Sequence, residues 1–173
     1  HQQEGLAAAV ASIPPDRRGD APGPGRWSTA EVIEHLAVVE RRLAKGFANW
    51  LAEARTNGVP PEHDTTPILP AIDTARVLSR SSRVAAPEPV RPTSRLTADD
   101  AWRALEEARA AVKQAVAAAD GLALSLIVKP HPLFGPLTMY EWIAFIGAHS
   151  ARHAAQIHEI GAATRAPEPL IEG

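Results

Sequence analysis

The sequence contains no cysteine, and this absence excludes several kinds of chemistry at once. The chain can form no disulfide, it has no thiolate nucleophile, and it has no thiolate to offer to a metal ion. Any metal must therefore be bound by histidine, aspartate or glutamate. The lack of cysteine fits the cytoplasmic location that we expect, although an exported protein without cysteine would look the same.

Long hydrophobic runs and an excess of one charge are also missing. No apolar stretch approaches the roughly 20 residues that cross a bilayer. The formal net charge is −2, with acidic and basic residues mixed along the chain. We therefore expect neither a nucleic-acid partner nor a membrane partner. At 173 residues, with 45% hydrophobic residues, the chain is predicted to form one domain, residues 1–173, with a sizeable core.

Proline is abundant, and its 16 copies fall in blocks that separate helical stretches. Seven of them lie between residues 57 and 97, where they exclude long helices and leave room for one short helix over residues 71–82. A connection of this length inside a compact domain is uncommon and is usually functional. We interpret residues 57–97 as a proline-rich connection that acts as a partial lid, a dimer contact or a linker.

The other long stretches have helical periodicity. Ser28 and Glu31 form a capping box, which predicts a helix over residues 29–55. Thr97 begins a helix that ends near Gly121, and a third long helix is predicted over residues 139–163, with Thr138 as its cap. A short alanine-rich helix over residues 2–13 precedes them, and strands find almost no support. The prediction is an all-α four-helix up-and-down bundle with one long connection.

Two histidines lie one turn apart on the last of these helices. His149 and His153 belong to an apolar stripe made of Trp142, Ile146, His149, His153, Ile157 and Ile160. A buried neutral imidazole needs partners for both ring nitrogens, and a metal ion shared by two imidazoles would satisfy one nitrogen on each. The stripe therefore indicates either a metal site or two histidines that hydrogen-bond within the core.

A third histidine lies on the inward face of an earlier helix. His35 comes one turn after Val32 and one turn before Val39, while charged residues such as Glu34 and Arg41 occupy other faces. Neutral imidazole is a good ligand for zinc, nickel or ferrous iron, and three such ligands leave a coordination position open, as in catalytic sites. We therefore predict a metal site of His35, His149 and His153, against the simpler interpretation that these histidines only pack or are exposed.

The remaining histidines are weaker candidates. The segment from His149 to His153 is His-Ser-Ala-Arg-His, which lacks the glutamate of the H-E-x-x-H motif. We therefore reject the zinc peptidases as the class of this protein. His158 should point away from the pair, and His63 should be solvated in the connection. His131 is expected either near the site or in a loop hydrogen bond.

Two carboxylates and one amide are secondary candidates. Glu31 and Glu141 could lie near the ion, although each is also suited to capping a helix. Gln156 could hydrogen-bond a ligand or merely line the bundle.

Two segments resemble the signatures of the DinB/YfiT-like superfamily. The first is WSTAEVIEHLAVVE, residues 27–40, and the second is HPLFGPLTMYEWIAFIGAHSARHAAQI, residues 131–157. The resemblance implies a four-helix bundle in which His35, His149 and His153 bind a divalent metal. It also implies dimers and a range of activities, among them transferases and isomerases that use mycothiol, bacillithiol or similar small thiols, and hydrolases.

Taken together, these features predict a metal-dependent enzyme with a small-molecule substrate. Our leading hypothesis is an S-transferase that uses a low-molecular-weight thiol at a zinc, nickel or iron ion, in a homodimer. The alternatives are a metal-dependent hydrolase at the same site and a non-enzymatic metal-binding or stress-response bundle. A further alternative has no metal, with the histidines bonded inside the core and the connection covering a small-molecule pocket.

Overall fold

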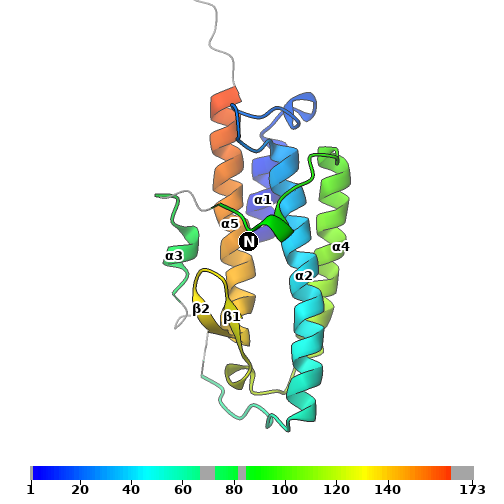
Figure 1. The fold of residues 1–173 in the computed structure, drawn as a ribbon, viewed down its shortest axis with the longest axis vertical. Coiled ribbons are helices and arrows are strands. Elements are labelled where there is room, and N and C mark those ends of the chain that lie inside the picture. The colour runs from blue at the N-terminus through cyan, green and yellow to red at the C-terminus, as the bar shows by residue number, and fades with distance from the viewer. Residues whose placement is uncertain (1, 67–72, 82–84, 165–173) are drawn as a thin grey trace, which may run out of the picture.

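The computed structural model describes residues 2–66, 73–81 and 85–164. The helices are α1 (Gln2–Ala11), α2 (Thr29–Thr56), α3 (Ala75–Leu78), α4 (Ala98–Ala117) and α5 (Met139–Thr164), with short 3-10 turns η1 (Pro15–Arg17), η3 (Glu88–Val90) and η4 (Leu124–Leu126). Figure 1 shows α1, α2, α4 and α5 side by side along the long axis. The predicted mainly helical fold is confirmed. None of the helices in the described ranges is long and apolar enough to cross a membrane.

Each long helix begins where its capping residues predict. Ser28 Oγ accepts the N–H of Glu31 at 3.2 Å, and Glu31 Oε2 accepts the N–H of Ser28 at 2.7 Å. Thr97 caps α4 by accepting the N–H of Asp100 at 3.1 Å. These side chains satisfy backbone donors that have no partner within the first turn, so they fix the helix starts locally.

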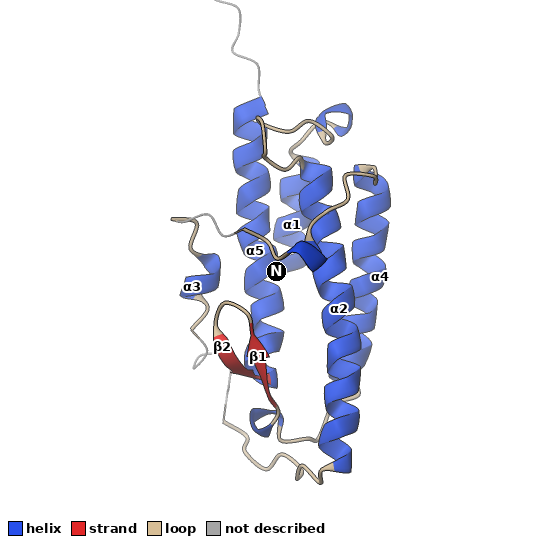
Figure 2. Cartoon of the chain, viewed as in Figure 1, coloured by secondary structure: helices blue, strands red, loops and turns tan. Residues whose placement is uncertain are grey.

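A two-stranded ribbon precedes α5 and corrects the prediction that strands are absent. β1 (Val128–His131) pairs antiparallel with β2 (Gly135–Thr138), as the red arrows of Figure 2 show. Each strand has only four residues, too few for an alternating pattern to stand out in the sequence. Gly135 has a φ of 77°, which suits glycine and closes the tight turn. Trp142 Nε1 donates to the carbonyl of Lys129 at 3.2 Å and ties the ribbon to α5.

The long helices do not alternate in direction as predicted. Glu40 of α2 contacts Arg109 of α4, and further along Arg55 of α2 bonds the carbonyl of Ala118 beyond the end of α4, so α2 and α4 run parallel. The colours of Figure 1 show α5 running the opposite way. The up-and-down alternation is therefore wrong for α2 and α4. With 28 residues, α2 is about 42 Å long, and the connection of residues 57–97 has enough chain to return along it.

The described parts of this connection pack against α2 and α5. α3 covers only part of the predicted helix over residues 71–82, of which residues 71, 72 and 82 lie outside the described ranges. Arg80 pairs with Glu159 of α5, with a bond of 2.8 Å from Nε to Oε1, and Arg152 Nη1 donates to the carbonyl of Val77 at 3.4 Å. η3 lies over α2 on the same side. The three roles left open for residues 57–97, a partial lid, a dimer contact or a linker, stay predictions.

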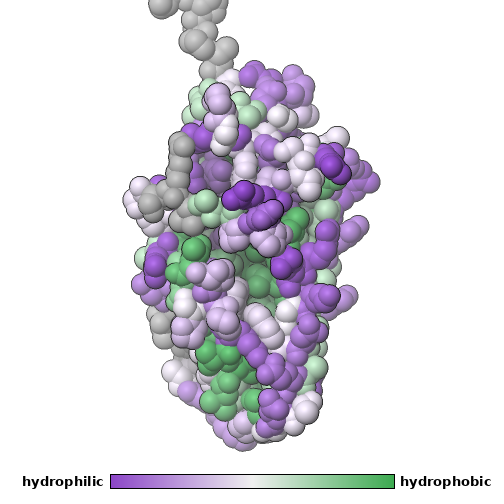
Figure 3. All heavy atoms as spheres, in the orientation of Figure 1, coloured by the Kyte–Doolittle hydropathy of each residue, from purple (hydrophilic) through white to green (hydrophobic). Residues whose placement is uncertain are grey.

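The core consists of two apolar clusters separated by polar residues. One cluster joins α1 to the first half of α2, the start of α4 and the end of α5, and the other joins the far halves of α2 and α4 to the ribbon and the start of α5. The polar side chains between them, which we call the polar layer, are the buried His35, Glu40, Ser150 and His153 and the half-buried Arg109 and His149. On the surface, Figure 3 shows hydrophobic residues gathered at the lower end of the face in view. The exposed large hydrophobic side chains of the described residues include Leu126 of η4 and Val128 of β1.

Candidate metal centre

The three predicted histidines lie together between α2 and α5. The ring centroid of His35 is 5.3 Å from that of His149 and 5.0 Å from that of His153, and the latter two are 4.5 Å apart. One nitrogen from each ring lies within 4.8 Å of the others, so the group could hold a metal ion. Tetrahedral nitrogen ligands about 2.0–2.1 Å from zinc would be about 3.4 Å apart, so small side-chain rotations would close the site.

Hydrogen bonds to Nδ1 leave Nε2 of two of these rings free for a metal. His35 Nδ1 lies 2.7 Å from the carbonyl oxygen of Val90, and His153 Nδ1 lies 2.8 Å from Oε1 of Gln156. Both acceptors require the Nδ1–H tautomer, which leaves the Nε2 lone pair unprotonated. Metal-binding histidines usually donate their second N–H to an oxygen in this way. The donor set therefore fits a metal ion.

The Nε2 atoms of His149 and His153 lie 3.1 Å apart. Two unprotonated nitrogens at this distance would repel each other, so either a proton or a cation must lie between them. In the metal-free chain the proton comes from His149, because His153 carries its own on Nδ1. A bound cation would replace that proton.

Burial keeps all three imidazoles neutral at neutral pH. Burial lowers the pKa of His35, and the bond to Val90 offsets part of this effect. Burial, and then the nearby His153, lowers the pKa of His149 well below its ordinary value. Burial, and then His35, lowers the pKa of His153 to about 3. Neutral imidazole is the form that binds metal, so protons compete weakly for this site.

Aromatic rings shield the centre on two sides. The ring of Trp27 lies 5.0 Å from His35, and Phe145 stacks on His149 at 5.0 Å with an interplanar angle of 21°. Phe145 also contacts His131, at 4.7 Å between centroids. These rings lower the local polarity and exclude water, which strengthens electrostatic interactions at the centre.

The other histidines occupy different environments. His131 is buried beside Phe134 and Trp142, and its Nδ1 accepts the N–H of Leu133 at 3.1 Å, so it makes the loop hydrogen bond. Its contact with Phe145 also places it near the centre, so both positions left open for it are observed. Burial lowers its pKa to about 4. His63 and His158 are exposed, as predicted.

The carboxylates considered in the sequence are engaged elsewhere. Glu31 completes the cap of α2, and Glu141 accepts both the N–H and the hydroxyl of Thr138, at 2.7 and 2.8 Å. Glu34 corrects the expectation that it lies on a face away from the inward one, because it is only 4% exposed beneath the connection. Its burial could not be inferred from α2 alone, since the covering residues lie about 60 positions away in the chain.

Three contributors to the centre were missed in the sequence. Val90 acts through its backbone carbonyl, which leaves no side-chain pattern to find. Glu34 holds the connection in place through Thr93 and Ser94. Phe145 could have been found, because it lies four residues before His149 and therefore on the same helix face.

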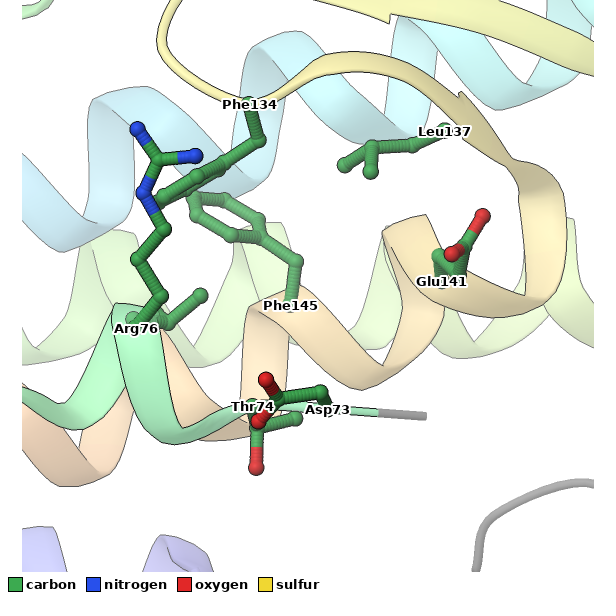
Figure 4. A pocket seen from close by; sticks show the side chains of 8 residues that line it. Asp73, Thr74, Arg76, Phe134, Leu137, Glu141 and Phe145 are labelled. Carbon is green, nitrogen blue, oxygen red and sulfur yellow. The ribbon is translucent and has the colours of Figure 1, made fainter. Parts of the chain in front are cut away.

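A small hollow adjoins the centre on the far side of Phe145 (Figure 4). It has a volume of about 190 Å³ and lies between α3, the ribbon and the start of α5. The guanidinium carbon of Arg76 is 5.1 Å from the centroid of the Phe134 ring. Figure 4 shows Arg76 beside Phe134 at one end and Glu141 at the other, beyond Leu137. The lining of the hollow thus combines apolar side chains with one cation, Arg76, and two carboxylates, Asp73 and Glu141.

Comparison with known proteins identifies the family of this chain. The profile of the DinB superfamily matches residues 1–157, a range that contains all three histidines. The chain belongs to the DinB superfamily. As a member, it is similar to the uncharacterized protein YuaE of Bacillus subtilis (strain 168), with 27% identity over 146 residues that cover 84% of this chain and 83% of the relative. No solved structure matches the chain. The family suggested by the two signatures is therefore confirmed.

Proposed function

We propose that this DinB superfamily protein is a metal-dependent enzyme whose divalent ion, zinc, nickel or iron, is bound by Nε2 of His35, His149 and His153. The observation that supports this proposal most strongly is the convergence of three neutral imidazoles, two of them with Nδ1 committed to an oxygen acceptor. An ion with three nitrogen ligands would keep a position open and lower the pKa of a thiol or water bound there.

The reaction we propose is transfer of a low-molecular-weight thiol to a small electrophile. The sulfur forms a bond to an electrophilic carbon, the leaving group departs with the electron pair of its own bond, and the thiol proton passes to solvent. A thiol loses its proton far more readily than water does, so it depends less on a neighbouring general base. This suits a centre whose nearest candidate carboxylates, Glu31 and Glu141, are committed to helix caps.

The protein would contribute shielding and positioning to this reaction. Trp27 and Phe145 exclude water from the histidines. The hollow beyond Phe145 offers Phe134 and Leu137 to the apolar part of the electrophile, and Arg76 to an anionic group on it. Approach of the electrophile past the edge of Phe145 would bring it toward the centre.

Two alternatives use the same residues. A metal-dependent hydrolase would need a carboxylate released from a cap to activate water, and a non-enzymatic metal-binding or stress-response protein would need only the ion. The DinB-like four-helix bundle and the homodimer, which the family resemblance implies, and the cytoplasmic location, which the lack of cysteine fits, are also proposals. Sedimentation of the purified full chain would test the homodimer.

The deciding experiment offers the metal-loaded full chain an activated aryl halide, with and without cysteine, glutathione, bacillithiol or mycothiol. We expect turnover with one of these thiols and none without it. His153→Ala should abolish turnover, while His158→Ala, which removes an exposed histidine from the same helix, should leave it unchanged. Turnover of ester substrates without any thiol would favour the hydrolase. Metal binding without turnover of either class would favour the non-enzymatic protein.

A further inference from the structure

A buried carboxylate holds the proline-rich connection against α2. Glu34 is 4% exposed, and its Oε1 accepts the N–H of Thr93 at 2.9 Å and the hydroxyl of Thr93 at 2.6 Å. Its Oε2 accepts the N–H of Ser94 at 3.2 Å. A carboxylate removed from water needs such donors, so this arrangement binds residues 93–94 firmly to α2. We call Glu34, Thr93 and Ser94 the clasp.

Backbone strain in the clasp is a second, independent observation. Ser94 has a φ of 60°, and among the described residues it is the only non-glycine residue with a positive φ. This conformation is costly for a residue with a Cβ, and it persists only where surrounding contacts impose it. The hydroxyl of Ser94 also donates to Glu31, so both glutamates of the first turns of α2 hold this residue. The contacts with Glu31 and Glu34 therefore hold Ser94 in a strained backbone conformation at the end of the connection.

The clasp lies a few residues from a contact with the metal centre. Three residues before Thr93, the carbonyl of Val90 accepts the Nδ1 proton of His35 at 2.7 Å. η3 ends at Val90, and only Arg91 and Pro92 lie between Val90 and Thr93. Because Glu34 and His35 are neighbours on α2, the clasp and the carbonyl contact form a closed loop of interactions around the histidine. Fixing Thr93 therefore fixes the acceptor that sets the tautomer of His35.

We propose that Glu34 and Thr93 are positioning residues of the metal centre. They hold the Val90 carbonyl on His35, so that His35 presents an unprotonated Nε2 to the ion. This inference rests on the proposed function for its metal, but it assigns a role to residues outside the histidine set. It predicts that loosening the clasp weakens metal binding although no ligand is changed.

The test compares two threonines whose hydroxyls make the same kind of bond at different places in the fold. Thr93 and Thr97 each donate their hydroxyl to a carboxylate at 2.6 Å, Thr93 to Glu34 and Thr97 to Asp100 at the start of α4. Thr93→Val should weaken zinc binding about 10-fold. This is the lower end of the loss seen when a metal ligand loses its hydrogen-bond partner, because the substitution acts on His35 only indirectly, through Val90. Thr93→Ser should restore the affinity. Thr97→Val should lower the thermal midpoint and leave the zinc affinity at the wild-type value.

Two measurements on these variants decide whether the clasp positions His35 for metal binding. Competition with a chromophoric chelator gives the zinc affinity, and nitrogen-15 NMR of the metal-free chain gives the tautomer of His35. We expect the Nδ1–H tautomer in the wild type, Thr93→Ser and Thr97→Val, and a mixture in Thr93→Val. The proposal is overturned if Thr93→Val matches the wild type in both measurements, or if Thr97→Val weakens zinc binding equally. If the wild type binds none of zinc, nickel and iron, the proposed function fails, and the tautomer still decides whether the clasp positions His35.

Discussion

The two sides of the polar layer differ in how their buried groups are satisfied. On one side, Arg109 Nε donates to both oxygens of Glu40, at 3.1 and 3.2 Å, and Arg109 Nη2 donates to Ser150 at 3.0 Å. Burial raises the pKa of Glu40, while Arg109 acts in the opposite direction. On the other side, three histidines present nitrogens to one another with no carboxylate among them.

This difference separates a structural cluster from a candidate functional one. The Glu40–Arg109 pair supplies its own counter-charge, and its donors meet acceptors within the chain. In the histidine centre, Nδ1 of His35 and Nδ1 of His153 each have an oxygen acceptor, and one nitrogen of each ring lies close enough to the others for a cation to complete the site. Both clusters contain buried residues of α2 and α5, so burial alone does not distinguish them.

The largest expected effect is a loss of stability when the Glu40–Arg109 pair is broken. Arg109→Met would leave Glu40, only 2% exposed, without its counter-charge. Removing one partner of a buried pair typically costs about 3–5 kcal/mol in the free energy of unfolding. Urea unfolding should show this loss, while metal content stays at the wild-type level. The double variant Glu40→Met with Arg109→Met should recover most of the stability. Loss of metal in a folded Arg109→Met protein would show that the two sides are coupled.

A smaller effect, confined to the histidine side, is expected at Gln156. Gln156→Leu removes the oxygen that accepts the Nδ1 proton of His153 at 2.8 Å. Loss of such an outer partner weakens metal binding by about 10- to 100-fold. A chelator competition would measure it, and Gln156→Glu, which keeps an acceptor, should bind metal at least as tightly as the wild type. Equal affinity in the leucine variant would mean that the tautomer of His153 is fixed by other contacts.

The last effect, which develops only as the pH falls below neutral, is a change in pH dependence at His131, next to the centre. Burial lowers its pKa from 6.5 to about 4 in the folded chain, so between these values the unfolded chain binds a proton that the folded chain does not. The free energy of unfolding must therefore fall as the pH drops from 6.5 to about 4, by up to about 1.4 kcal/mol per pH unit for each such proton.

The matched variant is His131→Asn, whose side-chain oxygen can still accept the N–H of Leu133. Denaturant titrations of the metal-free protein at several pH values should give a shallower decline in this variant than in the wild type. An identical decline would show that His131 does not titrate differently in the two states.

Local sequence signals predicted the helices and the histidine set well. Capping residues such as Ser28 and Thr97 act within one turn, so their effect can be inferred without knowing the rest of the fold. His149 and His153 share a helix face by spacing alone. Spacing alone cannot show that His35 reaches them, because its distance from them depends on how α2 packs against α5. Its inward position and the family signatures were what suggested it.

Features that depend on distant parts of the chain were missed. The parallel direction of α2 and α4 follows from the path of the connection, which proline-rich sequence does not specify. The burial of Glu34 and the strain at Ser94 arise only when residues about 60 positions apart meet. The ribbon depends on its packing against α5 more than on strand propensity, which is a weak signal over four residues.

The central claim is that the histidine side of the polar layer binds a metal ion. Mass spectrometry of the full chain, purified without an affinity tag, would measure metal content in the wild type, His149→Ala and the exposed-histidine control His158→Ala. The account predicts about one zinc, nickel or iron ion per chain in the wild type and the control, and almost none in His149→Ala. Little metal in the wild type, even after incubation with excess ion, would contradict it.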